Sequence, residues 1–409
     1  MPNIGIVGAG VAGLHLGLLL RKHDVPVTIY TDKTPQQIAA GRLLNSVAHH
    51  APTLERERHL GVDFWPVEEY GYTCHHHYVG GSGPLRFRGD FSRGSSAIDY
   101  RLYLPKLTEV FQQRGGDLRI GALRTEDVEG VAGQHDLVVV SAGRGAFTSL
   151  FPRRPEYSPF EAPQRRLCVG LYHGVTPSEP KGVTISMSPG HGELLEIPMF
   201  SREGHVTALL FENIPGGDLA ILADLKYDDD PALFTKTVLS KVAQHHPDTF
   251  ERIDPAQFRL TSPQDLLQGA LVPTVRADYA ELPGGTFALA AGDAHAVVDP
   301  LLGQGANSAS HSAWVIGRAI LDDLGFDEMF CQRVAKLRSD VVLSAAQWTN
   351  LMLQPPPAHL LGLMGAMNEN KAAADEFTDN FDYPDRQWRI VATADRTRAF
   401  LAKHGTVLP

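Results

Sequence analysis

The sequence predicts an α/β fold that carries a second, mostly antiparallel sheet and a helical C-terminal region. Three observations support this. A complete β-α-β pattern occupies residues 4–31, short strand-like runs separated by turn residues fill about 165–265, and a mainly helical pattern covers 327–409. A further buried strand pattern at 287–293 follows the middle segment, so we expect that segment to interrupt the first sheet.

The first segment predicts two parallel strands joined by a helix. Residues 4–7 form a short β-branched run, as expected for a strand buried on both faces, and 27–31 form another. Between them, 14–23 have an apolar stripe and basic residues near the end, which favours a helix. A unit of this kind joins parallel strands by a right-handed crossover. We also expect a helix at 100–114 and a buried parallel strand at 136–143.

The remaining elements follow from changes of period along the chain. The middle segment predicts short strands near 168–172, 183–187, 194–200 and 206–211. The acidic residues at 228–230 predict the cap of a helix that ends near 245, and a further helix is expected at 306–324. These patterns predict a discontinuous first domain of 1–165 and 265–330, a second domain of 166–264, and a helical region of 331–409 that is broken at 355–357.

Composition and charge argue against several classes of protein. The chain has 409 residues and a formal net charge of −10, which disfavours a nucleic-acid partner or an anionic membrane surface. No apolar run is long enough to span a membrane, and the N-terminus lacks the pattern of a signal peptide. The cysteines Cys74, Cys168 and Cys331 lie far apart, which fits a reducing cytoplasm better than a disulfide scaffold.

The turn after the first strand carries the pattern Gly8-x-Gly10-x-x-Gly13. Because this pattern follows a strand and opens a helix, it predicts a dinucleotide site instead of an ordinary glycine turn. Gly8 allows the tight turn, Gly10 lets the backbone approach a pyrophosphate, and Gly13 lets helix and strand pack closely. The helix N-terminus offers N–H groups to the phosphates. Thr31 stands where an acidic residue usually binds the ribose, so we expect loose cofactor binding, with Asp32 either pointing inward or starting a turn.

A second signal lies far along the chain. Asp293 ends the strand pattern at 287–293, and a carboxylate at a strand end can bond a sugar hydroxyl of the cofactor. The segment 299–307 leads into a helix, and its amides at 303–307 can face an electron-rich ring. An enzyme that binds only a nicotinamide cofactor does not need this second element. A flavin, whose ribityl chain and ring extend further, does.

These motifs together resemble the Rossmann-type, aromatic-hydroxylase fold of FAD enzymes. The resemblance rests on the glycine pattern, on Arg101 within 97–101, and on Gly292-Asp293 with Asp299-Pro300. The closer resemblance is to the epoxidase component of the styrene and indole monooxygenases, a two-component FAD-dependent family. The stretches that resemble this family span the chain in order: 4–17, 43–49, 78–81, 188–193, 226–231, 303–307 and 375–388.

The resemblance implies a fold, a reaction and a partner. The fold is an FAD-binding domain of 1–165 and 265–330, into which the sheet of a substrate domain is inserted. The reaction is the epoxidation of styrene and related vinyl arenes, small apolar aromatic substrates, by reduced FAD and O₂ through a C4a-hydroperoxyflavin. A separate NADH-dependent flavin reductase supplies the reduced FAD by transient contact, which agrees with the single glycine fingerprint in the chain. A homodimer is left open.

The resemblance also implies the residues of the site. Asn45 is the catalytic candidate, because its amide can orient flavin and substrate. The expected substrate pocket consists of Leu43, Leu44, Val47, His49, Tyr72, His75, Ser95, Pro300 and Gln304. The expected cofactor-binding residues are Gly8, Gly10, Ala12, Gly13, Thr31, Arg42, Arg101, Gly143, Asp293, Pro300, Gly303, Gly305, Ala306 and Asn307. The residues that resemble the styrene branch more than the indole branch are Asn45, Val47, His49, Tyr72, His75 and Ser95.

Several alternatives stay open. Arg42 is either a cofactor contact or a surface charge. The histidines at 75–77 alternate along a strand and cannot converge, so no metal site is expected. The alternative functions are an indole monooxygenase of the same family, a single-component NAD(P)H-dependent aromatic hydroxylase, and a flavin-binding sensor without oxygen transfer.

Overall fold

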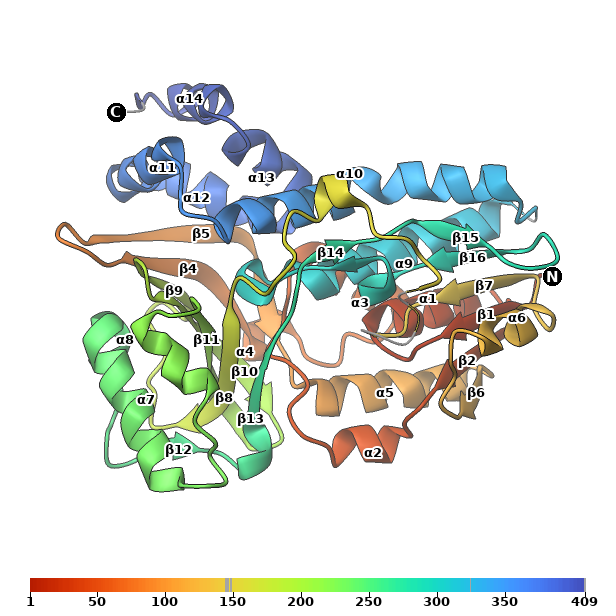
Figure 1. Ribbon diagram of the computed structural model, residues 1–409, viewed down its shortest axis with the longest axis horizontal. Coiled ribbons are helices and arrows are strands. Elements are labelled where there is room, and N and C mark those ends of the chain that lie inside the picture. Colours follow the sequence, from red (N-terminus) through yellow and green to blue (C-terminus); the bar gives the residue numbers. More distant parts are fainter. Residues whose placement is uncertain (144–146, 148, 324, 408–409) are drawn as a thin grey trace.

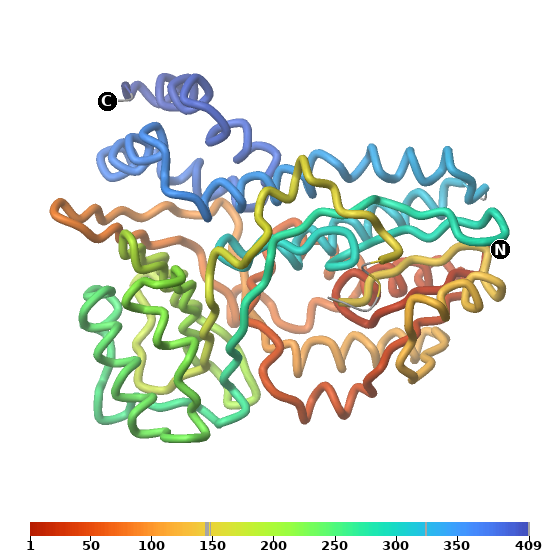
Figure 2. The backbone as a smooth tube through the Cα atoms, viewed as in Figure 1, coloured from red at the N-terminus to blue at the C-terminus, as the bar shows by residue number. Residues whose placement is uncertain are grey.

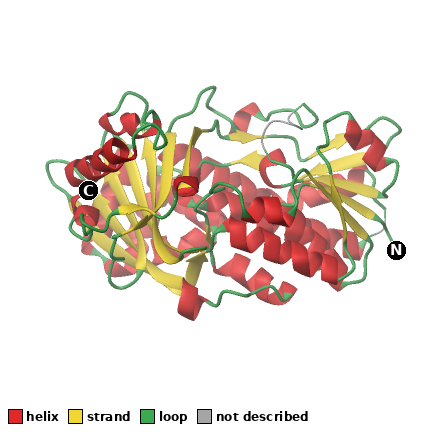
Figure 3. Ribbon diagram, turned by 90° about the horizontal axis from the view of Figure 1, so that it is seen from below, coloured by secondary structure: helices red, strands yellow, loops and turns green. Residues whose placement is uncertain are grey.

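The computed structural model describes residues 1–143, 147, 149–323 and 325–407. Two large sheets lie at opposite ends of the molecule, with a layer of helices between them (Figure 3). Helices of the C-terminal region cover the larger sheet (Figure 1). The predicted α/β fold, with a mostly antiparallel second sheet and a helical C-terminus, is confirmed.

Six strands among the described residues form the first sheet. In spatial order they are β15 (Tyr279–Glu281), β16 (Phe287–Ala290), β7 (Leu137–Val140), β1 (Ile4–Val7), β2 (Val27–Thr31) and β6 (Asp117–Ile120). All neighbours are parallel except β15, which is an antiparallel edge strand. The chain returns to this sheet after it has built the second one, because β16 pairs with β7 (Figure 2). The predicted insertion is therefore confirmed.

The two faces of the first sheet bury different side chains, because successive residues of a strand point to opposite faces. Ile4 and Ile6 pack with the helices α1 (Val11–Lys22), α5 (Tyr100–Gln113) and α9 (Gln304–Asp322). Val7 points the other way, into a cluster with α6 (Asp127–Ala132). Helices α1 and α9 begin earlier than the predicted 14 and 306, because each starts directly after a glycine N-cap.

Nine strands among the described residues form the second sheet. The path through it is β12 (Arg259–Leu260), β8 (Arg166–His173), β11 (Gly204–Asn213), β10 (Gly192–Ser201), β9 (Gly182–Ser188), β4 (Gly71–Val79), β5 (Leu85–Ala97) and β3 (Ala48–His49), and β13 (Leu266–Ala270) also pairs with β8. One face, with Cys168 and Phe211, packs on α7 (Pro231–His245). The other face carries Val169 and Leu210 toward the centre of the molecule.

The predicted boundaries assign the second sheet to residues 166–264 alone, whereas the observed sheet also includes strands from outside that segment. Strands β3, β4 and β5 come from 48–97, which the prediction assigned to the FAD-binding domain. They join the second sheet because β4 pairs in parallel with β9. A strand pattern reveals that a segment is extended, but it does not reveal the partner strand. The division into domains stays a prediction.

The C-terminal helices connect the two sheets. Helix α10 (Glu328–Met352) packs on α9 and on α13 (Pro384–Val391). Helix α12 (Lys371–Asp379) lies so close to β5 that a Cβ at Gly89 would collide with Thr378. The remaining helices are α2 (Pro35–Ala39), α3 (Ala51–Leu60), α4 (Val67–Tyr70), α8 (Pro247–Phe250), α11 (Ala358–Glu369) and α14 (Ala394–Lys403), with a short strand pair β14 (Thr274–Val275) and β17 (Ala296–Val297). In the part of the chain that the structure describes, no helix has the length and apolar character needed to cross a membrane.

Candidate active site

A cavity of about 890 Å³ lies between the two sheets. Its first end is lined by the glycine loop after β1, by the ends of β2 and β7, and by residues 292–293 after β16. Its second end is lined by apolar side chains of the nine-stranded sheet. The volume falls in the range of small-molecule and cofactor sites.

The glycine loop forms a backbone cradle at the first end. Gly8 has φ +114°, and a Cβ there would lie 2.6 Å from the backbone nitrogen of Ala142. A Cβ at Gly13 would collide with the carbonyl oxygen of Gly8. No atom lies within 4 Å of the position that a Cβ of Gly10 would take. The first two glycines therefore serve the packing of strand and helix, and Gly10 leaves open space in front of the N-terminus of α1, which fits a pyrophosphate.

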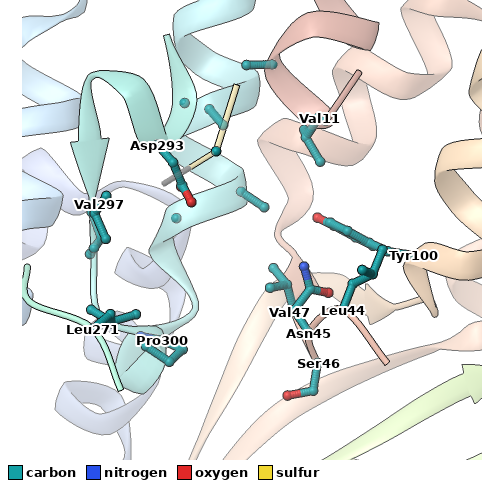
Figure 4. Close-up of a pocket in the computed structure, with 18 of the residues that line it drawn as sticks. Val11, Leu44, Asn45, Ser46, Val47, Tyr100, Leu271, Asp293, Val297 and Pro300 are labelled. Carbon is teal, nitrogen blue, oxygen red and sulfur yellow. The ribbon is translucent and has the colours of Figure 1, made fainter. Parts of the chain in front are cut away.

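Polar residues lie on both sides of this cradle. Thr31, Asp32 and Lys33, at the end of β2, line the cavity. Asp293 lines the opposite wall, where the short helical turn Gly292–Ala294 follows β16. Figure 4 shows Asp293 across the open space from Asn45. This arrangement offers hydroxyl and carboxylate groups to the sugar portions of a dinucleotide.

The start of α9 forms one wall near the middle of the cavity. Gly303, in the left-handed conformation with φ +64°, is the N-cap, and Gly305 and Ala306 also line the cavity. Asp299 accepts a hydrogen bond of 3.1 Å from the backbone nitrogen of Leu301 and so caps the short turn before Gly303. The positive end of the helix faces the cavity, where it can stabilise negative charge on a bound ring.

The second end of the cavity is apolar. Its lining side chains are Leu167, Val169, Val183, Ile185, Leu195, Ile197, Leu210, Leu267, Leu301, Leu302 and Phe381. They come from β8, β9, β10, β11 and β13, from the turn before α9, and from the short turn Asn380–Asp382. These side chains can bury an aromatic hydrocarbon and exclude water.

Within the part of the chain that the structure describes, four buried polar atoms at this cavity have no hydrogen-bond partner: Asn45 Oδ1, His50 Nε2, Tyr72 OH and His75 Nδ1. Burial lowers the pKa of His50 to about 3 and holds that of His75 well below its ordinary value, while burial raises the pKa of Tyr72. All three side chains are therefore neutral at pH 7. A bound molecule could satisfy these atoms.

The structure brings most of the predicted residues to the cavity. The predicted substrate-side residues that line it are Leu44, Asn45, Val47, Tyr72, His75 and Pro300. The predicted cofactor residues that line it are Gly8, Gly10, Ala12, Thr31, Gly143, Asp293, Pro300, Gly303, Gly305 and Ala306. The predicted residues outside the lining are Leu43, His49, Ser95 and Gln304 on the substrate side, and Gly13, Arg42, Arg101 and Asn307 on the cofactor side.

The two arginines outside the cavity are engaged elsewhere. Arg101 is fully buried and forms ion pairs of 2.6 Å with Asp99 and with Asp265. It thereby joins α5 to the turn that precedes β13. Arg42 is exposed and lies 3.3 Å from Asp228, also exposed. A phosphate contact from Arg42 would require it to leave this pair, which an exposed pair permits at little cost.

The other outside residues support the wall from behind. Asn307 donates to the carbonyls of Ala48 and Gly303, and its Oδ1 accepts from the backbone nitrogen of His50. Gln304 donates to the carbonyls of Leu302 and Phe381. These bonds connect β3, the start of α9 and the C-terminal region at one point.

The predicted site residues do not include His50 and Phe381, both of which line the cavity. His50, directly after β3, lines the cavity, and its Nδ1 is hydrogen-bonded to Ser95 Oγ at 3.2 Å, whereas the neighbouring His49 points into the protein. Adjacent residues of an extended segment face opposite sides, and nothing in the sequence states which side is the cavity. Phe381 reaches the cavity from a distant part of the chain: it lies within 375–388, a stretch that resembles the family, but nothing in the sequence places its side chain at the site.

The three histidines at 75–77 separate as expected for a strand. His76 Nε2 lies 2.8 Å from the carbonyl oxygen of Pro180, and His77 stacks on Phe87. Among the described residues, no group of three or more His, Cys, Asp or Glu could hold a metal ion. The three cysteines are buried, and none forms a disulfide.

Comparisons with known proteins give sequence relatives over nearly the whole chain. Residues 143–252 match a family model described as "Styrene monooxygenase A putative substrate binding domain". The chain is 50% identical over 398 residues to styrene monooxygenase StyA of Pseudomonas fluorescens, with 96% of each chain covered. A second styrene monooxygenase StyA, from a Pseudomonas species, is 49% identical with the same coverage.

Solved structures resemble the chain in fold. A flavoprotein/dehydrogenase from Cytophaga hutchinsonii has a TM-score of 0.66 at 15% identity, and the match covers 99% of this chain and 97% of that one. PqsL of Pseudomonas aeruginosa in complex with 2-aminobenzoylacetate has a TM-score of 0.63 at 14% identity, covering 96% and 100%. The flavin-dependent brominase Bmp2 also has a TM-score of 0.63 at 14% identity, covering 100% and 94%.

Proposed function

The chain belongs to the styrene monooxygenase StyA family, and we propose that it epoxidises styrene and related vinyl arenes with reduced FAD and O₂. It is an FAD-dependent oxidoreductase, a flavoprotein monooxygenase. The observation that carries the proposal is a single cavity that joins a dinucleotide cradle to an apolar chamber. Such a cavity holds a flavin and an aromatic hydrocarbon side by side.

The residues present fit FAD. The space in front of Gly10, which no atom fills, lies at the N-terminus of α1 and would receive the pyrophosphate. Thr31 and Asp293 would bond the sugar hydroxyls from opposite walls. The amides at Gly303, Gly305 and Ala306 would face the ring system. FAD in its reduced form supplies the electrons and the activation of O₂.

The protein's own part in the reaction is to position the reactants and to exclude water. An alkene needs no acid or base in order to react with an electrophilic oxygen, so proximity and a dry chamber supply much of the rate. We propose Asn45 as the residue that orients flavin and substrate, because its partly buried amide lines the cavity across from Asp293 (Figure 4) and its Oδ1 has no partner among the described residues. Leu44 and Val47 complete the apolar wall.

The family indicates a flavin reductase as the partner. We propose further that this reductase uses NADH and meets the chain only transiently. The single glycine fingerprint of the sequence supports this, because the chain has no second Rossmann unit for a nicotinamide cofactor. The division into an FAD-binding domain of 1–165 and 265–330, a substrate domain of 166–264 and a helical region of 331–409 is part of the same proposal, with a homodimer as an open alternative.

A single turnover tests the proposed function. The protein is mixed with chemically reduced FAD, O₂ and styrene in the absence of NAD(P)H, and the products are analysed. Styrene oxide is the expected product, and it would establish both the chemistry and the independence from a bound nicotinamide. Flavin reoxidation that yields only hydrogen peroxide would contradict the proposal, and the next assay would be phenols with NAD(P)H.

Indole is a second candidate substrate. The partnerless atoms Asn45 Oδ1, Tyr72 OH and His75 Nδ1 can accept a hydrogen bond from an indole N–H, which styrene does not have. A parallel reaction with indole would give blue pigment. Pigment without styrene oxide would move the protein to the indole branch.

A further inference from the structure

A buried chain of hydrogen bonds leads away from the cavity at Tyr100. The ring of Tyr100 lines the cavity, opposite Asp293 (Figure 4). Its hydroxyl lies 2.7 Å from His49 Nε2, and His49 Nδ1 lies 2.6 Å from Glu57 Oε1. Tyr100, His49 and Glu57 are each about 5% exposed. The three side chains therefore form a continuous path from the cavity into the protein.

The chain continues beyond Glu57. Tyr103 donates its hydroxyl hydrogen to the same Oε1 at 2.7 Å, and His15 Nε2 lies 2.7 Å from the Tyr103 hydroxyl. His15 Nδ1 lies 3.0 Å from Ser310 Oγ, which accepts a hydrogen bond from Arg56 at 3.1 Å. Helices α1, α3, α5 and α9 each contribute to this path.

The partners determine where the protons lie. Burial alone would raise the pKa of Glu57, but the charge and hydrogen bond of His49, with His15 and Tyr103, hold it below its ordinary value, so Glu57 is a carboxylate. A carboxylate only accepts, so His49 donates to it from Nδ1 in either charge state, and when His49 is neutral its Nε2 accepts from Tyr100. On the other side, Tyr103 donates its hydroxyl hydrogen to Glu57, so its oxygen accepts from His15 Nε2, and Nδ1 of the neutral His15 ring accepts from Ser310. Burial lowers the pKa of His15 to about 4, so that ring stays neutral and donates from Nε2.

This arrangement can hold one additional proton. When the His49–Glu57 pair takes up a proton, His49 Nε2 becomes a donor to Tyr100, and the hydroxyl hydrogen of Tyr100 is then free to point into the cavity. Release of that hydrogen to a group in the cavity returns each bond to its starting direction. The other charged or titratable groups that face the path are Arg56, His15, Tyr103, His50, and Asp293 across from Tyr100.

We propose that Tyr100 is a catalytic acid of the oxygenation cycle and that His49 and Glu57 position and recharge it. This inference rests on the proposed function. With reduced FAD as its monoanion, the net reaction converts alkene, O₂, reduced FAD and one proton to epoxide, oxidised FAD and water. One oxygen atom enters the epoxide, and the other leaves as water with the flavin hydrogen and the added proton. That proton must enter a cavity from which water is excluded, and the Tyr100 hydroxyl is at that cavity and bonded to the buried His49–Glu57 pair that can resupply it.

The main test compares Tyr100→Phe with the wild-type protein in rapid mixing of the FAD-reduced protein with O₂ and styrene. Tyr100→Phe should slow the return of oxidised FAD by about 10²-fold, the usual contribution of a positioned acid. In Tyr100→Phe the rate of flavin reoxidation should rise as pH falls, because the proton must then come from solvent. In the wild-type protein the same rate should not change over that pH range. Tyr279→Phe is the control: it removes a hydroxyl that bonds Glu328 at the edge strand β15, outside the path, so its profile should also stay flat. A wild-type rate and a flat profile in Tyr100→Phe would overturn the proposal.

A second readout does not depend on activity. Proton NMR of the protein without FAD should show the Nδ1–H of His49 as a strongly downfield signal, because it is held in a short bond to a carboxylate. The signal should persist in Tyr100→Phe and disappear in Glu57→Gln, and persistence in Glu57→Gln would overturn the assignment. If Glu57→Gln does not fold, the kinetic comparison of Tyr100→Phe with Tyr279→Phe decides alone. Absence of epoxide from the wild-type protein would instead overturn the proposed function, whatever the NMR signal.

Discussion

The two ends of the cavity are lined by different kinds of atoms. The cofactor end is mostly backbone: Gly8, Gly10, Gly143 and Gly303 present main-chain atoms or open space to the ligand. The substrate end is mostly side chains, contributed by strands β8 to β11 and by Phe381 near the C-terminus. A backbone cradle depends on a few consecutive residues. A side-chain wall depends on which distant strands pair and on which face each residue occupies.

Substitutions at the two ends should therefore have different effects. At the cofactor end, a single added methyl group changes backbone packing or removes ligand space. At the substrate end, the same cavity tolerates changes that alter its shape without affecting the cradle.

Gly13→Ala should destabilise the protein by about 3 kcal/mol or more, because the added Cβ would collide with the carbonyl oxygen of Gly8 in the turn between β1 and α1. Gly10→Ala is the matched control. Gly10 has φ −81°, which alanine adopts freely, and its Cβ would meet no atom. Urea denaturation should therefore show little change for Gly10→Ala, while FAD titration should show binding weakened by about tenfold or more. Equal stability losses in the two variants would contradict the division of roles among these glycines.

The sequence predicted the cofactor end better than the substrate end for the same physical reason. The glycine pattern predicts the local geometry of the cradle, because the strand, the turn and the helix that form it are consecutive in the chain. Arg101 illustrates the limit: its position in the motif suggested a cofactor contact, yet it lies buried between Asp99 and Asp265. The direction of a long side chain depends on where its partners lie, and Asp265 is distant in sequence.

His49 and Val169 show the second limit. The apolar run at 168–172 predicted a strand, but Cys168 and Val169 face opposite layers, and only strand pairing decides which of them meets the cavity. In the same way, His49 and His50 differ by one position and face different environments. The periodicity of a strand shows that successive side chains point to opposite faces. Only the tertiary structure determines which face lines the cavity.

Val169→Phe should reduce epoxide formation by about 10- to 100-fold, because the larger ring occupies the apolar chamber and displaces the substrate from its reacting position. FAD affinity should change by less than about threefold, since the cradle lies at the other end. Single-turnover product analysis and FAD titration measure the two effects. Leu171→Phe, on the same face of β8 but outside the cavity lining, is the control for overpacking. A large loss of FAD affinity in Val169→Phe would show that the two ends are not separable.

Glu212 in β11 and Asp299, at the start of the turn before α9, form a buried pair of carboxyl groups. Burial, and then the charges of Asp299 and Glu193, raise the pKa of Glu212 well above its ordinary value, and burial raises that of Asp299 to about 6. The folded state therefore favours protonated carboxyls, while the unfolded chain ionises near pH 4. Stability should fall as pH rises from about 4 through 6 and beyond, because the folded protein must then hold negative charge on buried carboxyls.

Glu212→Gln should remove part of that loss. We expect its free energy of unfolding to exceed that of the wild type by roughly 1–3 kcal/mol at pH 8 and to match it near pH 4. Urea midpoints at pH 4, 6 and 8 measure the difference. Glu203→Gln, at the exposed turn of the same hairpin, should show no such dependence. A difference that is constant across pH would exclude ionisation of Glu212 as the cause.

The smallest effect is expected at the ribose side of the cradle. Thr31 ends β2 beside the exposed Asp32, and both line the cavity. A hydroxyl makes an uncharged contact with a sugar, so the isolated protein should be nearly colourless. Thr31→Glu adds a carboxylate that accepts a charge-assisted bond, and it should tighten FAD binding by about 3- to 10-fold, or ~1 kcal/mol. Thr31→Val removes the hydroxyl and should weaken binding slightly. If Thr31→Glu weakens FAD binding instead, Asp32 already binds the ribose, and the new carboxylate repels the carboxylate of Asp32. The ribose contact would then depend on the direction of a side chain, as the contacts at the substrate end do.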